Sequence, residues 1–365
     1  MELFWFGHET TLYREGVLLL AVIATLYTAM MLVAVGNLLF MKRPKGQDHP
    51  CFEVLIPARN EAENIAKVVR PLVASGVKVT VFDDDSSDAT AEIAKAHGAL
   101  ILNASVPLPA GWTGKNYGCH QLTLTSTTSW TVFLDADTIP GEAFADRLSA
   151  FLVQCDPEIK VVSGFAKMIP GRGFEPAYLT WVSWILLATN PFALVARTKK
   201  GHNRFTNGQF SAWRTDCLKE VKPFYQVRSQ VLEDVLIGRL LARLRIRTEI
   251  IDMSEILSVR MYEDIREAMN GMSKNSCDIM GNPIASVLLS LFLLVIAWGW
   301  LFCGAHALVV LALLLAGKLA SDRAVRTPIW VFIFAPITIT TGALTIIWST
   351  LLKRKGKVTW KDRTY

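Results

Sequence analysis

Acidic side chains that suit metal binding and acid–base chemistry gather at a few places along this chain of 365 residues. Asp135 and Asp137 are separated by one residue and directly follow the apolar run Val132 to Leu134. On an extended strand, residues two apart point to the same side, so both carboxylates face one direction. D-x-D alone is also typical of helix caps and solvated turns. Two oxygens at the end of a strand nevertheless suit a hard divalent cation with open positions for phosphate, which predicts a divalent-cation site.

Two more acidic groups have the same kind of setting. The run Asp83 to Asp85 follows the apolar run Val77 to Phe82, and its three adjacent carboxylates need partners or a polar ligand because like charges repel. Glu233 and Asp234 open an apolar helical pattern. A helix N-terminus favours anions for structural reasons alone. Adjacent helical residues point about 100° apart, so we expect only one of this pair to face a substrate.

Short apolar runs and helical patterns alternate in the middle of the chain. The runs are Phe52 to Ile56, Val77 to Phe82, Ala99 to Leu102 and Thr131 to Leu134, and helical patterns open at Glu61 and Asp88. Runs of about five residues separated by roughly 10 to 15 helical ones predict βαβ units on a mostly parallel sheet. Ligands of such sheets bind beyond the carboxyl ends of the strands, where these acidic groups lie.

Long uncharged runs flank this α/β region. Residues 17–40 contain no Asp, Glu, Lys or Arg, and Lys42, Arg43 and Lys45 follow them. About 20 helical residues cross a hydrocarbon core, and trailing basic residues favour the cytosolic side. We therefore predict a short N-terminal segment at 1–16, an uncleaved transmembrane anchor at 17–40 and a cytosolic α/β domain at 41–283.

The C-terminal part contains two more uncharged runs, 284–317 and 329–352, followed by a basic tail at 353–365. We predict a transmembrane region at 284–352 with two or three segments. As one helix the first run would span about 51 Å, which exceeds one crossing, whereas a hairpin gives two short crossings. A hairpin would place the basic tail on the non-cytosolic side of the membrane, whereas a single crossing would place the basic loop between the two runs there. Both arrangements stay open. One segment is expected to be kinked, re-entrant or interfacial.

A further apolar segment near 174–200 lies within the predicted cytosolic domain. Polar residues dilute it and Pro191 interrupts it, while Trp181 and Trp184 suit a membrane interface. A buried core helix is the alternative. We expect a helix that lies in the membrane interface.

Composition excludes several classes of protein. The chain is 52% apolar and 19% charged, with a formal net charge of +6. This composition excludes disordered and collagen-like chains, and it indicates that part of the chain lies in a lipid bilayer. Basic residues cluster beside the apolar runs, so no nucleic-acid partner is expected. The six cysteines form no C-x-x-C pair, which argues against a zinc site or disulfide framework and fits a reducing, cytosolic location.

Four short motifs occur in an order and spacing that are specific in combination. They are Ile56-Pro57-Ala58-Arg59-Asn60-Glu61, Phe82-Asp83-Asp84-Asp85-Ser86-Ser87-Asp88-Ala89-Thr90, Asp135-Ala136-Asp137 and Glu233-Asp234. Over roughly 180 residues this arrangement resembles family 2 glycosyltransferases of the GT-A type. The resemblance implies a Rossmann-like α/β domain with a mostly parallel sheet, here carrying N- and C-terminal transmembrane helices.

Other segments narrow the resemblance to membrane-anchored enzymes of bacterial carotenoid and hopanoid pathways, including the diaponeurosporenoate glycosyltransferase type. They are Gly111-Trp112-Thr113-Gly114-Lys115-Asn116, Arg260-Met261-Tyr262, Gly271-Met272-Ser273-Lys274-Asn275 and the tail Trp360-Lys361-Asp362-Arg363-Thr364-Tyr365. Asp85 and Asp362 stand where this family usually has glycine. The Q-x-x-R-W motif of processive synthases is absent from the sequence, which indicates a single transfer.

The resemblance also implies roles for individual residues. Asp137 and Asp135 would bind Mg²⁺ or Mn²⁺, and Asp234 would be the general base beside Glu233. The residues that would contact the donor are Pro57, Arg59, Glu61, Asp84, Lys115 and Asp135. Those that would lie on the acceptor side are Asn207, Gly208, Gln209, Arg260 and Tyr262. Asp84 would accept a hydrogen bond from uracil.

The implied activity is inverting, non-processive transfer of one sugar from a nucleotide-diphosphate sugar, UDP-linked, to a membrane lipid such as a carotenoid or hopanoid. The enzyme would be a multi-pass protein of the inner cell membrane with a cytosolic catalytic domain. The alternatives are a polyprenyl-phosphate sugar synthase and a non-catalytic membrane scaffold.

Overall fold

The computed structural model describes residues 2–104, 107–197, 203, 205–280, 282–354, 359–360 and 363–364. The chain divides into two compact units. An α/β unit consists of Phe40–Ile169 and Phe192–Met261, and a helical unit consists of Met1–Leu39, Pro170–Pro191 and Tyr262–Tyr365. Asp362, one of the two positions where glycine was expected, lies outside the described residues.

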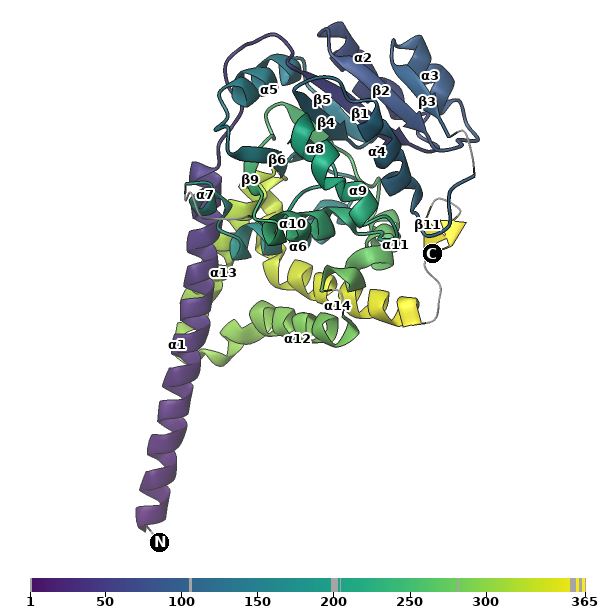
Figure 1. Cartoon of the computed structure of the whole chain (residues 1–365). Coiled ribbons are helices and arrows are strands. Elements are labelled where there is room, and N and C mark those ends of the chain that lie inside the picture. The colour runs from purple at the N-terminus through teal and green to yellow at the C-terminus, as the bar shows by residue number, and fades with distance from the viewer. Residues whose placement is uncertain are drawn as a thin grey trace. The chain divides into compact units, whose positions relative to one another are not determined.

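A seven-stranded sheet with the order β3-β2-β1-β4-β8-β6-β9 forms the middle of the α/β unit (Figure 1). Its strands are β1 (Phe52–Ala58), β2 (Lys78–Asp83), β3 (Leu100–Asn103), β4 (Trp130–Leu134), β6 (Ile159–Phe165), β8 (Phe210–Arg214) and β9 (Arg247–Asp252). Strand β8 pairs antiparallel with both neighbours, and all other pairs are parallel. The predicted α/β fold with a mostly parallel sheet is confirmed.

Helices cover both faces of this sheet because successive strand residues point to opposite sides. Val54 and Ile56 of β1 pack with the helices of one face, whereas Leu55 packs with those of the other. The first face carries α2 (Ile65–Ala74), α3 (Thr90–Ala96) and α5 (Phe144–Val153), and the second carries α4 (Gly114–Leu124), α8 (Thr215–Val221), α9 (Pro223–Gln226) and α10 (Glu233–Arg243). The carboxyl ends of β1, β2 and β4 meet at one edge between these layers.

A three-stranded sheet completes the α/β unit. Its order is β5-β10-β7, with β5 at Thr138–Pro140, β7 at Lys167–Met168 and β10 at Leu257–Val259. At the other end of the unit, Lys42 and Arg43 bind the buried carboxylates of Glu249 and Asp252 at 2.6 and 2.7 Å. Two of the basic residues that follow the first apolar run are therefore tied to β9.

The helical unit is made mainly of long apolar helices. They are α1 (Glu2–Phe40, up to Leu39 in this unit), α6 (Glu175–Thr189), α12 (Pro283–Trp298), α13 (Ala307–Ala324) and α14 (Ala335–Arg354). The amphipathic helix α11 (Ile265–Asn275) also belongs to this unit. The apolar run 284–317 is divided between α12 and α13 by the 3-10 turns Gly299–Phe302 and Gly304–His306.

Five helical segments among the described residues are long and apolar enough to cross a membrane, by length and composition. They are Gly16–Phe40, Glu175–Val195, Pro283–Phe302, Gly304–Ala324 and Ile329–Lys353. The segment Glu175–Val195 includes the short helix α7 (Phe192–Val195), which belongs to the α/β unit. These helices indicate that the protein associates with a membrane.

Candidate active site

Two loops at the carboxyl ends of β1 and β2 are joined by hydrogen bonds. The Asn60 N–H donates to Ser86 Oγ at 3.0 Å, and the Glu61 N–H donates to Thr90 Oγ1 at 2.8 Å. The Thr90 N–H in turn donates to Asp88 Oδ1 at 3.0 Å. Ser86, Asp88 and Thr90 therefore hold the loop that carries the predicted donor-binding residues, which gives these motif positions a structural task.

Arg59 and the acidic run after β2 form the next part of the edge. Its guanidinium donates to the carbonyl oxygens of Asp84 and Asp85, the latter at 3.0 Å. The backbone of Asp85 has a φ of +58°, in the left-handed region that favours glycine. The turn thus adopts the conformation of the expected glycine, and asparagine and aspartate tolerate it better than other side chains do.

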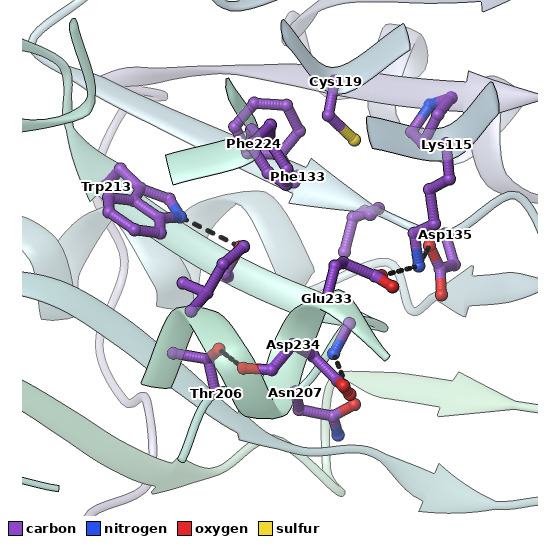
Figure 2. A pocket seen from close by; sticks show the side chains of 15 residues that line it. Lys115, Cys119, Phe133, Asp135, Thr206, Asn207, Trp213, Phe224, Glu233 and Asp234 are labelled. Atoms are coloured by element: carbon purple, nitrogen blue, oxygen red, sulfur yellow. Dashed lines mark hydrogen bonds and ion pairs between the residues drawn. The ribbon is translucent and has the colours of Figure 1, made fainter. Parts of the chain in front are cut away.

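Lys115 links two of the acidic groups (Figure 2). Its ammonium lies 2.7 Å from Asp135 Oδ1, at the end of β4, and 2.8 Å from Glu233 Oε1, at the start of α10. Burial lowers the pKa of Lys115, but the two carboxylates outweigh that effect and hold the pKa well above its usual value. A permanent positive charge therefore sits between Asp135 and Glu233.

Asp234 lies on the other side of Gly208. Its Oδ2 accepts from the Gly208 N–H at 3.2 Å, and its Oδ1 accepts from the Val235 N–H at 2.8 Å. Burial, reinforced by the negative charge of Glu233, raises the pKa of Asp234 to about 6. A Cβ atom on Gly208 would lie 3.1 Å from the Lys115 ammonium, so only glycine gives the backbone this close approach without displacing a neighbour.

The loop that contains Gly208 is fixed by Ser163 of β6. Ser163 Oγ accepts from the Asn207 N–H at 2.8 Å and donates to the carbonyl of Phe210 at 2.7 Å. The Asn207 amide donates to Gly164 O at 3.0 Å, and the Gln209 N–H donates to Asn207 Oδ1 at 3.1 Å. Sequence reasoning missed Ser163, although a polar residue inside the apolar strand Ile159–Phe165 is a signal for such a role.

The surroundings of Asp137 fit a divalent cation. Its Oδ1 is buried and has no hydrogen-bond partner among the described residues. Burial, followed by the negative charges of Asp135 and Glu61, raises the pKa of Asp137 to about 7. A Mg²⁺ or Mn²⁺ ion would supply the missing positive charge and use hard oxygen ligands. No group of three or more His, Cys, Asp or Glu side chains placed to hold a metal ion is found in the described part of the chain.

A pocket brings together residues predicted for the donor, the base and the acceptor side. Among the described residues, it is lined by Pro57, Lys115, Asp135, Asn207, Gly208, Glu233 and Asp234 and by an apolar group that includes Cys119, Phe133, Trp213 and Phe224 (Figure 2). The apolar group was not predicted, although Cys119 lies four residues after Lys115 and thus on the same face of α4.

The remaining predicted residues lie outside this lining. Arg59, Glu61 and Asp84 are in the two loops after β1 and β2, and Gln209 follows Gly208 directly. Arg260 is an exposed residue just after β10. Tyr262 belongs to the helical unit, where its ring packs directly against Gly271.

Comparisons with known proteins identify a family and two similar relatives. Residues 49–269 match the family model described as "Glycosyltransferase like family 2". A 4,4'-diaponeurosporenoate glycosyltransferase of Staphylococcus haemolyticus is 36% identical over 101 residues, 27% of either chain. One from Staphylococcus aureus strain USA300 is 30% identical over 115 residues, 29% of this chain and 31% of the relative. The matches therefore span less than a third of the length of these curated relatives.

Two similar solved structures are of glucosyl-3-phosphoglycerate synthase from Mycobacterium tuberculosis. One, in complex with Mn²⁺, uridine diphosphate and glucosyl-3-phosphoglycerate, has 21% identity and a TM-score of 0.43, with 63% of this chain and 77% of that chain covered. The other, with Mg²⁺ and uridine diphosphate, has 20% identity and a TM-score of 0.44 over the same shares.

Proposed function

The chain belongs to glycosyltransferase family 2, and on that premise we propose that it transfers one sugar from a nucleotide-diphosphate sugar, UDP-linked, to a membrane lipid. The transfer is non-processive and inverts the anomeric carbon. The acceptor is a carotenoid, a hopanoid or a similar lipid.

One observation carries this proposal. The Lys115 ammonium joins Asp135, on the donor side, to Glu233, which precedes the proposed base, at 2.7 and 2.8 Å. A single positive charge thus lies where a donor diphosphate and an acceptor would meet. A scaffold without catalysis has no need to gather three partly buried charged groups around one glycine, because taking charge out of water is costly.

The donor side consists of the residues at the ends of β1, β2 and β4. Pro57, Arg59 and Glu61 border the nucleotide, and Asp84 accepts a hydrogen bond from the uracil ring. Lys115 contacts the diphosphate as a point charge. Asp137 and Asp135 would hold Mg²⁺ or Mn²⁺, and the bound ion would supply positive charge against the charge that builds on the leaving diphosphate.

Asp234 is the general base of the proposed reaction. With a pKa of about 6 its carboxyl group is ionised at neutral pH and close enough to that pH to accept a proton. It takes the proton of the acceptor hydroxyl while the acceptor oxygen attacks the anomeric carbon and the bond to the diphosphate breaks. Hydrogen bonds from Gly208 and Val235 orient the carboxylate.

The acceptor is presented from the membrane. Residues 17–40 anchor the chain, residues 41–283 form the cytosolic part with an interfacial helix near 174–200, and 284–352 form the C-terminal transmembrane region before the tail 353–365. Asn207, Gly208 and Gln209 border the acceptor beside Asp234, and the resemblance alone assigns Arg260 and Tyr262 to the acceptor as well. The apolar helical segments Gly16–Phe40, Pro283–Phe302, Gly304–Ala324 and Ile329–Lys353 support a multi-pass membrane protein, and we place it in the inner membrane.

Labelled donors test this function directly. Membranes that contain the full chain are incubated with labelled UDP-sugars, Mn²⁺ and a lipid extract, and the labelled lipid is identified by mass spectrometry. We expect one lipid product that carries a single sugar residue. Free sugar without any labelled lipid, or label in a polymer, would contradict the proposal.

A further inference from the structure

Asn116 is fully buried beside the proposed site, yet its side chain does not line the pocket in the described structure. Its amide nitrogen donates to the carbonyl oxygens of Val227 and Gln230, each at 2.9 Å, and to that of Arg228 at 3.4 Å. Its own Oδ1 has no hydrogen-bond partner among the described residues. The Asn116 side chain therefore contacts its surroundings as a hydrogen-bond donor. All three of the acceptors are backbone carbonyls of residues 227–230.

That stretch leads directly to the acidic pair. Residues 227–230 lie between α9 and α10, and α10 begins at Glu233. Thr113 adds a fourth tie, because its N–H donates to Arg228 O at 2.8 Å while its Oγ1 caps the N-terminus of α4. The first turn of α4 thus holds the backbone that enters α10.

The neighbouring Lys115 binds the same region through its side chain. Lys115 contacts the Glu233 carboxylate, and Asn116 binds the backbone three to six residues before it. We infer that Asn116 is a positioning residue: through the 227–230 backbone it sets where Glu233 and Asp234 stand relative to Lys115. The predicted effect of Asn116 on turnover rests on the proposed function, whereas its effect on the position of the 227–230 backbone does not.

The cost of losing the amide is concentrated in that backbone. Removing the donor takes one hydrogen bond from each of three carbonyl groups. The Val227 carbonyl still accepts from the Gln230 N–H and the Arg228 carbonyl from the Thr113 N–H, so the loss falls mainly on the Gln230 carbonyl, nearest to α10. The start of the segment is tied to α9, because the Val227 N–H donates to the Pro223 carbonyl at 3.1 Å and the Arg228 N–H donates to the Tyr225 carbonyl at 3.4 Å. Without the Asn116 amide, the part of the segment that leads into α10 is expected to relax and let α10 shift. A displacement of about 1 Å at a catalytic group can reduce turnover roughly 100-fold.

Asn116→Asp tests the inference, because it keeps the shape of the side chain and replaces the donor by an acceptor. The matched control is Thr131→Val, which removes the buried 2.8 Å hydrogen bond between Thr131 and Thr215 without touching 227–230. Hydrogen exchange of the full chain in membranes is followed by mass spectrometry, together with kcat and the KM for the donor. Asn116→Ala provides the same test if the aspartate variant fails to fold.

We expect exchange of the amides of 227–232 to accelerate about tenfold or more in the Asn116 variants and to stay unchanged in Thr131→Val. We also expect kcat to fall at least about tenfold while the donor KM changes less than about twofold. Uniform acceleration over the whole α/β unit, or unchanged exchange at 227–232, would overturn the inference. If the wild-type chain transfers no sugar, the proposed function fails, and the exchange result still decides whether Asn116 positions this segment.

Discussion

The Gly208 N–H donates to Oδ2 of Asp234 over 3.2 Å, so a glycine from one side of the pocket directly orients the proposed base on the other. This contact joins a loop at the start of β8 to the first turn of α10. Residue 208 has little room for a side chain. The charged groups of Lys115 and Glu233 lie within 3.4 Å of the position that a Cβ atom on residue 208 would occupy.

Gly208→Val is therefore expected to lower kcat by about 100-fold or more, since the added side chain displaces the Lys115 ammonium and the Asp234 carboxylate. Gly141→Val is the control, because the nearest atom to its Cβ is at an ordinary 3.5 Å. Turnover of both variants is measured with the labelled donor. Equal losses in the two variants would show that crowding at Gly208 has no special effect.

Asp137→Asn removes the carboxylate proposed to bind the metal. We expect lipid glycosylation to stop, and Mn²⁺ binding in the presence of UDP, measured by calorimetry, to weaken about tenfold or more. The metal-free protein is expected to unfold at the same or a higher temperature, because one of three crowded negative charges is gone. A variant that keeps Mn²⁺-dependent turnover contradicts the metal assignment.

The pH dependence of kcat/KM reports on Asp234 in the free enzyme. Its pKa of about 6 predicts that kcat/KM is low below that pH, where the base is protonated, and rises to a plateau above it. Glu233→Gln removes a negative charge that raises this pKa, so the rise is expected to move to lower pH. A shift to higher pH, or none, would contradict the role of Glu233.

The acceptor chemistry is read from Asp234→Asn. A hydroxyl acceptor needs its proton removed, so the variant should lose about 100-fold or more of its turnover. A carboxylate acceptor is already ionised at pH 7, so the loss should be less than about tenfold and the product should be a glycosyl ester. Alkaline hydrolysis of the labelled lipid distinguishes the two products, because it cleaves a glycosyl ester and leaves an O-glycoside intact.

Asp85 stands in a glycine-like conformation with an exposed side chain. Asp85→Gly is therefore expected to leave the melting temperature unchanged or to raise it, whereas Asp85→Ala should cost about 1 kcal/mol because alanine fits φ of +58° less well. Thermal unfolding of the two variants side by side checks this order. The reverse order would show that the Asp85 side chain stabilises the turn.

Much of the α/β unit is predictable because local patterns encode it. The apolar runs at 52–56, 77–82, 99–102 and 131–134 mark β1 to β4, and the acidic residues follow the ends of β2 and β4 as expected for strand-end ligand sites. Glu233 begins α10, as the apolar pattern after it predicts. Each of these features depends on residues close together in the sequence.

The features that escaped prediction depend on long-range pairing. The antiparallel insertion of β8 between β4 and β6 brings Gly208 to Lys115, and nothing local to residues 207–214 specifies that register. Ser163 and Asn116 bind backbone groups more than 40 residues away in sequence. Their role follows only from the folded arrangement.

The central claim is that this site moves a sugar from a nucleotide to a lipid, and one measurement tests it most directly. Purified full-length protein in lipid vesicles is given a labelled UDP-sugar, Mn²⁺ and the lipid extract, beside the Asp137→Asn and Asp234→Asn variants. The account predicts a labelled lipid with one sugar residue from the wild type, none from Asp137→Asn, and a reduced yield from Asp234→Asn. Equal lipid labelling by all three proteins, or none by the wild type with any UDP-sugar, would contradict it.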